Sequence, residues 1–323
     1  MPTTLDPTPS ERAPWQHTLN RLSNPSTVTE AIAEADLDWQ VGLRPLFAGE
    51  DLQVRVKDRY VVCRLDKAED DPAAIMGLVG RDYTPIQNHE AFSFLDPLLS
   101  KGSAEVVAAG SLRGGRRVYM QVKLPGEIRV TPEDVIHKYL LLSNSHDGTS
   151  AVRAGVTPIR LACSNALSVM IKNMGSISIR HYPDVVDQVK QATHLLSLVE
   201  NAYDKAEEIM QAMARTPMDD RSAMQYFETV LPDPDDAEEA ERERLDQRRQ
   251  RWMELYEFGD GNQMRGVRGT AFAGLQGIVQ WCDRESYTDR NKEPINTVFF
   301  GTAERIKRRA FEEASRLAHI HLN

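Results

Sequence analysis

The sequence predicts an α+β protein: a twisted, mostly antiparallel β-sheet core with packed helices, followed by a long helical hairpin and C-terminal helices. Two observations carry this prediction. A glycine pair, Gly114-Gly115, separates two segments that alternate apolar and polar residues, which is typical of a β-hairpin. Apolar residues then recur at spacings of three and four between Val185 and Met213, which indicates a long amphipathic helix.

Shifts in composition divide the 323 residues into four regions. Residues 1–27 are rich in Pro, Thr and Ser and poor in apolar side chains, which predicts a disordered tail. Residues 28–182 form the predicted α+β core with a basic hairpin, and residues 183–257 form the helical hairpin. Residues 258–323 hold a glycine-rich loop and helices that we expect to pack on the core.

The core is predicted to begin with a short helix within residues 28–41. Residues 53–65 read QVRVKDRYVVCRL, which predicts a strand, a turn at Lys57-Asp58 and a second strand. Residues 77–85 predict a further short strand. Residues 87–100 place apolar side chains at helical spacing after an asparagine suited to cap a helix.

The basic hairpin is predicted at residues 104–124, and its second arm presents Tyr119, Gln121 and Lys123 on one face. Two strands and several helices complete the chain. The strands are expected at 135–142 and 156–162. The helices are expected at 165–174, 185–213, 236–257, 271–284 and 301–320, with a bend and a short helix at 216–235.

Composition excludes several classes of protein. The values of 41% hydrophobic and 27% charged residues are those of globular proteins. No apolar run of about 18 residues indicates a membrane span, and the N-terminus lacks the features of a signal peptide. Three well-separated cysteines predict a reducing, cytoplasmic setting. The net charge is −9, yet residues 77–182 hold 12 Lys and Arg against 8 Asp and Glu, so a partner would meet a local positive field.

The segment at residues 144–149, NSHDGT, brings together residue types found at catalytic sites. His146 and Asp147 could form a base and its orienting partner, with Ser145 or Cys163 as the nucleophile. Direct neighbours cannot form a triad, because adjacent strand residues point to opposite faces. A metal site of His146 and Cys163 would need two further ligands. We interpret the segment as a turn held by the Asp147 carboxylate, with a phosphate-contacting loop as the alternative.

The hairpin tip is the strongest candidate for a binding site. Arginines offer forked donors that match phosphate oxygens, and two glycines let the backbone approach a phosphate chain closely. The alternative interpretation is a solvated tip whose arginines keep the sheet edge soluble. The predicted phosphate contacts are Arg113, Arg116, Arg117, Lys123, Arg153 and Arg160, and Tyr119 is predicted to stack a base.

An enzymatic interpretation of the same hairpin uses Glu105, Gln121 and Lys123, which resemble the acid and Glu/Gln-x-Lys arrangement of metal-dependent nucleases. Such a site needs at least two carboxylates to hold Mg²⁺, and here the middle position is a glutamine.

A second candidate for anion binding is the glycine-rich loop that precedes the helix at 271–284. Arg265, Arg268 and Thr270 stand where the bare N–H groups of a helix start could hold an anion. The loop lacks the Gly-Lys-Ser/Thr of a P-loop and follows a helix rather than a strand, so it predicts neither an ATPase nor a dinucleotide site. The alternative role of Thr270 is that of a helix cap.

Several motifs together resemble a known family. They read YTPIQN at 83–88, AGSLRGGRRV at 109–118, LSNSHDGT at 142–149, FGDGN at 258–262 and GVRGT at 266–270. The chain resembles the phage/plasmid-like protein family, a domain of unknown function carried by mobile elements, from about residue 40 to its end. The order of elements also resembles, in architecture alone, the Rad-type single-strand annealing proteins, which form rings and hold single-stranded DNA in a basic groove.

The leading hypothesis is a mobile-element protein that binds single-stranded DNA, and anneals strands as a homo-oligomer or ring, without ATP, cofactor, metal or membrane. The six basic residues and Tyr119 would form the contact, and no catalytic residue is expected. The alternatives are a metal-dependent nuclease and a protein-binding regulatory or counter-defence factor that uses the acidic segment at 233–246.

Overall fold

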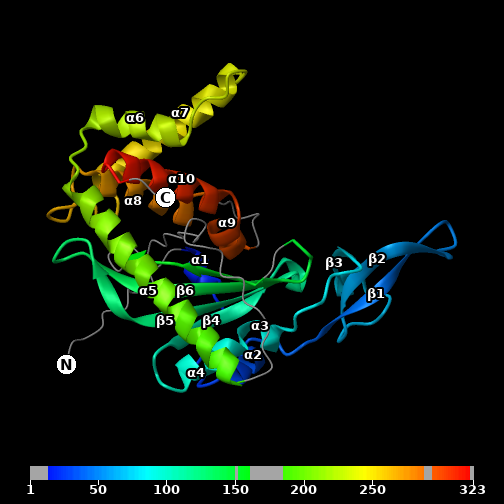
Figure 1. The fold of residues 1–323 in the computed structure, drawn as a ribbon. Helices are drawn as coiled ribbons and strands as arrows, with labels where there is room; N and C mark the ends of the chain where they lie inside the picture. The colour runs from blue at the N-terminus through cyan, green and yellow to red at the C-terminus, as the bar shows by residue number, and fades with distance from the viewer. Residues whose placement is uncertain (1–13, 150–151, 161–184, 287–292, 321–323) are drawn as a thin grey trace.

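A computed structural model of the chain describes residues 14–149, 152–160, 185–286 and 293–320 (Figure 1). It confirms the α+β class. A five-stranded and a three-stranded sheet, both antiparallel, occupy the N-terminal half, and long helices follow. The three-stranded sheet projects to one side of the larger one (Figure 1). The helix predicted at 165–174 and Cys163 lie outside the described residues.

The described elements follow one another in the order of the predicted pattern. The first half comprises α1 (Pro14–His17), α2 (Val28–Glu34), β1 (Val41–Ala48), β2 (Val54–Arg64), β3 (Ile75–Gly80), α3 (Asn88–Phe92), α4 (Asp96–Leu99), β4 (Glu105–Leu112), β5 (Arg117–Arg129), β6 (Val135–Ser145), β7 (Arg153–Val156) and β8 (Ile159–Arg160). The second half comprises α5 (Val185–Arg215), α6 (Asp220–Val230), α7 (Glu239–Phe258), α8 (Ala271–Arg284), α9 (Pro294–Phe300) and α10 (Thr302–Leu317).

The smaller sheet corrects one prediction. No turn reverses the chain at Lys57-Asp58, because β2 runs from Val54 to Arg64 and pairs with both β1 and β3. Asp58 has a φ of 55°, and the β1–β2 register shifts between Pro45 and Phe47, so β2 carries extra residues as a bulge. The bulge absorbs the turn-forming residues without reversing the strand.

The larger sheet has the order β4-β5-β6-β7, and β8 also pairs with β6. The predicted hairpin is β4 and β5, with Leu112 paired to Arg117 across the tip. Gly114 and Gly115 close the tip with φ values of 68° and 94°, a region that favours glycine. Strand β6 ends at Ser145, within the segment at residues 144–149 that resembled a catalytic site, and it pairs with β7.

Both faces of the larger sheet are covered. One face joins α2–α4 and α5 in the main hydrophobic core. The other face lies under α1 and α9 in a second cluster that contains Trp15, Tyr119 and Phe299. Residues 14–27 therefore correct the prediction of a disordered tail, because the buried Trp15 ring anchors them and Leu22 N–H donates to Val107 O at 3.1 Å.

The long helices pack on the sheet and on one another. α5 runs diagonally across the larger sheet (Figure 1). The Tyr203 hydroxyl on α5 accepts from the Tyr139 backbone N–H at 2.7 Å and donates to the Tyr139 carbonyl. α7 packs most extensively on α8, where Gly277 allows close approach because a Cβ there would lie 2.9 Å from Tyr256 N. No helix in the described ranges is long and apolar enough to cross a bilayer.

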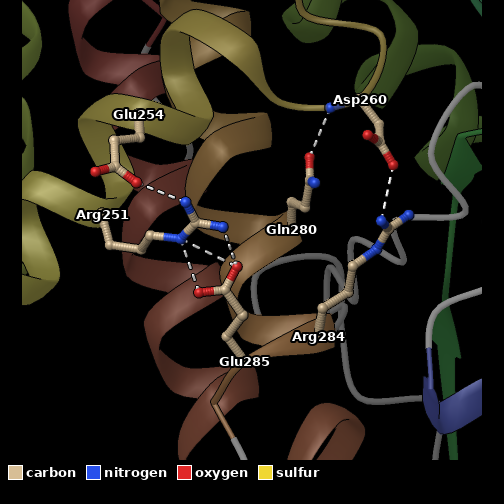
Figure 2. Close-up of polar contacts among 6 residues, drawn as sticks. All are labelled: Arg251, Glu254, Asp260, Gln280, Arg284 and Glu285. Atoms are coloured by element: carbon tan, nitrogen blue, oxygen red, sulfur yellow. Dashed lines mark hydrogen bonds and ion pairs between the residues drawn. The ribbon is translucent and has the colours of Figure 1, made fainter.

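Polar contacts tie α7 and its following loop to α8 (Figure 2). Arg251 on α7 donates to Glu285 at 2.8 Å and to Glu254 at 2.5 Å. Beyond the end of α7, Asp260 receives the Arg284 guanidinium at 2.8 Å, and its backbone N–H donates to Gln280 at 2.9 Å. Carboxylates therefore neutralise Arg251 and Arg284, whereas Arg248 of α7 lies over the Trp281 ring of α8.

A buried ion pair joins α8 to α10. Lys307 Nζ lies 2.8 Å from Asp283 Oδ1, and both side chains are fully buried. Lys307 also lies over the Phe299 ring at 5.5 Å, which links α10 to the cluster under α9. A buried pair is costly to break because the remaining charge loses both its partner and its hydration.

We predict that Lys307→Met lowers the free energy of unfolding by about 3–5 kcal/mol, because Asp283 is left charged and buried. Adding Asp283→Asn removes that charge, so the double variant should recover a large part of the loss. Urea denaturation of the three proteins tests this. A double variant as unstable as Lys307→Met would show that the pair's charge is not the cause.

Candidate nucleic-acid interface

The tip of the β4–β5 hairpin is held by two carboxylates from distant parts of the chain. The backbone N–H of Arg113 donates to Glu293 Oε1 at 2.5 Å, just before α9. The Arg113 guanidinium donates to Asp147 Oδ2 at 3.2 Å, in the turn that follows β6. Arg113 itself has a φ of 55° and its side chain is 43% exposed. The tip is therefore fixed in place while its surface stays accessible.

Arg117, the first residue of β5, is a half-buried cation. Its guanidinium carbon lies 4.5 Å from the centre of the Phe300 ring, which stabilises the charge through the ring quadrupole. Burial lowers the pKa of Arg117, nearby Asp147 opposes this, and the positive charges of Arg113 and Arg153 add to the lowering. No carboxylate among the described residues forms an ion pair with Arg117.

Arg116 and Arg153 complete a group that we call the arginine cluster: Arg113, Arg116, Arg117 and Arg153. Both side chains are exposed, and neither forms an ion pair with a described carboxylate. Strand pairing brings them to one end of the sheet, since Arg117 is opposite Ser145 and Arg153 is opposite Ser143. The cluster can offer several forked donors to one anionic group.

The other predicted contacts do not join this cluster. Lys123 lies six residues further along β5, and α1 and α9 cover the sheet face between it and Arg117. Tyr119 is only 2% exposed, and burial raises its pKa to about 12. The prediction that Tyr119 stacks a base is therefore wrong, because the ring forms part of the cluster under α1 and α9. The Arg160 side chain lies outside the described residues.

The segment at residues 144–149 is a structural turn. Asp147 accepts bonds from the Ser145 hydroxyl and from the Thr149 backbone at 3.0 Å, besides its contact with Arg113. Burial raises the pKa of Asp147, but these hydrogen bonds and the nearby arginine outweigh it and hold the pKa below its usual value. Ser145, His146 and Asp147 form no relay, because His146 bonds elsewhere.

The same turn docks the smaller sheet. A Cβ on Gly77 of β3 would lie 2.6 Å from the Asp147 Cα, so only glycine permits this approach. Gly148, with a φ of 76°, lies against Val79 of the same strand. The turn thus connects β3 to the end of β6.

His146 is fully buried beside this contact. Its Nε2 lies 2.7 Å from Asn88 Oδ1, an oxygen that can only accept, so neutral His146 carries its proton on Nε2. Nδ1 is buried and has no hydrogen-bond partner among the described residues. Burial lowers the pKa of His146 to about 4, Asp147 opposes this, and Arg64 adds to it.

The residues of the nuclease alternative share a cavity over the middle of β5. Glu105, Gln121 and Lys123 line it together, and Glu105 is the one carboxylate among its lining residues. No group of three or more His, Cys, Asp or Glu side chains is placed to hold a metal within the described part of the chain. The carboxylate pair that a magnesium-dependent mechanism needs is therefore not formed by these residues.

The glycine-rich loop lies at the end of the larger sheet opposite the hairpin tip, with Gly266 against Thr131. Thr270 caps α8 by accepting from Ala273 N–H at 3.3 Å, so its hydroxyl is engaged. Arg265 and Arg268 are exposed. These two arginines form a separate basic surface and do not extend the arginine cluster.

Sequence reasoning missed Phe300 and Glu293. Both contact the hairpin tip across about 180 residues of chain. A contact of that separation leaves no local pattern, and neither residue belongs to a motif. The approach of Asp147 to Arg113 had a partial signal in the turn-forming residues around it.

The fold and the site define an α+β protein that carries an arginine cluster on a β-hairpin tip. The chain belongs to the family described as DUF932, a domain of unknown function, whose profile matches residues 75–316. That range begins at β3 and ends within α10. Comparison with curated proteins and with solved structures gave no match.

We predict that Gly77→Ala lowers the free energy of unfolding by about 1–3 kcal/mol, because the methyl group overlaps the Asp147 backbone. Gly80→Ala on the same strand is the matched control, since a Cβ there meets nothing within 4 Å and should change stability by less than about 0.5 kcal/mol. Urea denaturation compares them. Equal effects of the two substitutions would mean that the turn does not press on β3.

Stability should fall as pH decreases from about 6.5 to about 4, because unfolded His146 takes up a proton that the folded state cannot accommodate. The full difference corresponds to about 3 kcal/mol. The pKa is depressed in the folded state of a base, so this contribution is complete above the unfolded pKa.

The measurement is the free energy of unfolding across this pH range for wild type, His146→Gln and the exposed control His319→Gln. His146→Gln should flatten the decline, and His319→Gln should not. An unchanged slope in His146→Gln would contradict the assignment.

Proposed function

We propose that the protein binds single-stranded DNA without ATP, through the arginine cluster at the hairpin tip. One observation carries the proposal: Arg117 is half-buried without an ion-pair partner among the described residues, and two further arginines lie near it. Burying a cation beside like charges costs free energy, and a bound anion would compensate that cost. A phosphate chain supplies such an anion and matches the forked guanidinium donors.

Two arginines in the helices, Arg249 and Arg251, contrast with the arginine cluster because both form ion pairs with carboxylates. Arg249 lies 2.6 Å from both Asp233 and Asp246, and Arg251 pairs with two glutamates. Carboxylates thus neutralise these two arginines, whereas Arg248 of the same helix is half-buried over the Trp281 ring and forms no ion pair with a described carboxylate. The cluster has four guanidinium groups, and among the described residues one ion pair, between Arg113 and Asp147, neutralises them, while Glu293 accepts from the backbone N–H of Arg113. Such a local excess attracts a polyanion even in a chain of net charge −9.

The setting that we propose is a mobile genetic element, a phage or plasmid, as the resemblance of the sequence motifs implies. Strand annealing by a homo-oligomer in the cytoplasm would be consistent with binding that reads phosphates rather than base edges. An exposed hairpin tip that is rigidly held suits such a role, because a fixed tip loses little conformational freedom when DNA binds.

The test is titration of a labelled single-stranded oligonucleotide at two salt concentrations. We expect affinity to fall steeply with salt, because each arginine–phosphate contact releases a counterion. Arg116→Glu with Arg117→Glu should weaken binding about tenfold or more at low salt, and reduce the slope of log affinity against log salt by roughly 1.4.

Arg305→Glu with Arg309→Glu is the matched control, since it makes the same change in charge at two exposed positions of α10. It should leave most of the affinity in place. Equal losses in the two double variants would mean that net charge alone governs binding. No detectable binding by the wild-type protein at low salt would refute the proposal.

A further inference from the structure

A small cavity lies between the N-terminal segment and the larger sheet, on the face that α1 covers. Its volume is about 200 Å³. Strands β4, β5, β6 and β8 form its floor, and residues 15–22 form its roof. The roof is fixed to the edge of β4, because Leu22 N–H donates to Val107 O and Ala109 N–H donates to Asn20 O at 3.2 Å. The cavity is thus built into the fold.

Gln121 is the buried polar group of this cavity. It is 3% exposed, it lines the cavity, and its amide has no hydrogen-bond partner among the residues that the structure describes. The oxygen and nitrogen of this amide are not among the described polar atoms that are shut off from solvent without a partner, so water or a ligand in the cavity can bond to them. An amide offers a donor and an acceptor side by side, which complements the edge of a nucleobase.

Charged groups stand beside this amide. Strand pairing places Glu105, Lys123 and Tyr139 in one row across β4, β5 and β6. Lys123 is half-buried and forms no ion pair with a described carboxylate, although Glu105 is directly opposite. Arg21 adds a second cation on the roof. The row and the roof together can hold an anionic group next to the Gln121 amide.

The remaining walls suit a flat ring. Trp15 and Tyr139 contribute aromatic surface, and Leu19, Leu22, Val107 and Ile159 contribute aliphatic surface. Aromatic walls favour a planar heterocycle through stacking and contact. The volume is below that of pockets for drug-sized ligands, so the cavity encloses one base, and a phosphate attached to it would lie toward the exposed Arg21 and half-buried Lys123.

From the Gln121 amide, the adjacent cations and the aromatic walls, we infer that this cavity binds the base of a nucleotide whose phosphate group lies beside it. Gln121 pairs with the base edge, and Lys123 with Arg21 holds the phosphate. The ligand is a free nucleoside monophosphate or one nucleotide of a DNA strand. The second source extends the proposed function, whereas the first is independent of it.

The experiment is calorimetric titration of the full chain with each deoxynucleoside monophosphate, with the matching nucleosides, and with inorganic phosphate. At least one monophosphate should bind more tightly than its nucleoside and than phosphate alone. Gln121→Leu should weaken that binding by about tenfold or more. It should leave thermal stability nearly unchanged, because the amide faces the cavity and leucine has a similar volume.

Lys123→Met should reduce the preference for the monophosphate over the nucleoside. Arg116→Glu with Arg117→Glu should leave monophosphate binding intact, because these arginines lie at the start of β5 and do not line the cavity. The inference is overturned if no monophosphate binds with a Kd below about 1 mM. It is also overturned if phosphate alone binds equally well, or if Gln121→Leu binds like wild type.

Competition identifies the source of the ligand. If a base of bound DNA enters the cavity, a single-stranded oligonucleotide displaces the monophosphate and Gln121→Leu weakens DNA binding. If the ligand is a free nucleotide, both bind together and Gln121→Leu changes only the monophosphate affinity. Monophosphate binding by a protein that does not bind DNA would support this site and refute the proposed function, so the two failures are distinguishable.

Discussion

The contact between the turn at residues 144–149 and strand β3 positions much of the N-terminal half. Gly77 permits the approach because it lacks the Cβ that would overlap Asp147, and the buried Asp147 carboxylate is satisfied by hydrogen bonds from its own turn. The same carboxylate receives Arg113 from the hairpin tip. One backbone approach therefore fixes the two sheets and the hairpin relative to each other, and His146 lies fully buried beside it.

The arginine cluster depends on this arrangement for its charge. Asp147 neutralises part of Arg113, while Arg117 and Arg153 retain their mutual repulsion. Such a cluster stays in place only because strand pairing and the Phe300 ring hold it, since free side chains would spread apart in water. Strand pairing offsets the repulsion among these arginines, and a bound anion would reduce that repulsion. The rigid sheet thus holds unpaired positive charges close together.

Local patterns in the sequence were sufficient for the hairpin, the long helices and the class of fold, because periodicity and glycine pairs act over short distances. They failed where long-range contacts decide the outcome. Trp15 turns a polar tail into a packed segment, and the covering by α1 and α9 buries Tyr119 within a strand that looked amphipathic. Four of the predicted phosphate contacts come together: Arg113, Arg116, Arg117 and Arg153. Lys123 lies apart from them because α1 and α9 cover the sheet face between it and Arg117. No local pattern in the sequence shows that these helices cover the face.

The limits of the family match separate the two sites. Every residue that builds the arginine cluster, from β3 through the hairpin and the turn to Phe300, lies within residues 75–316. The cavity has its floor within that range, but its roof of residues 15–22 lies outside it. A cation, Arg21, and an aromatic wall, Trp15, therefore come from sequence that the family profile does not cover. The proposed phosphate site at the tip therefore lies wholly within the family profile, whereas the cavity needs this N-terminal segment in order to close.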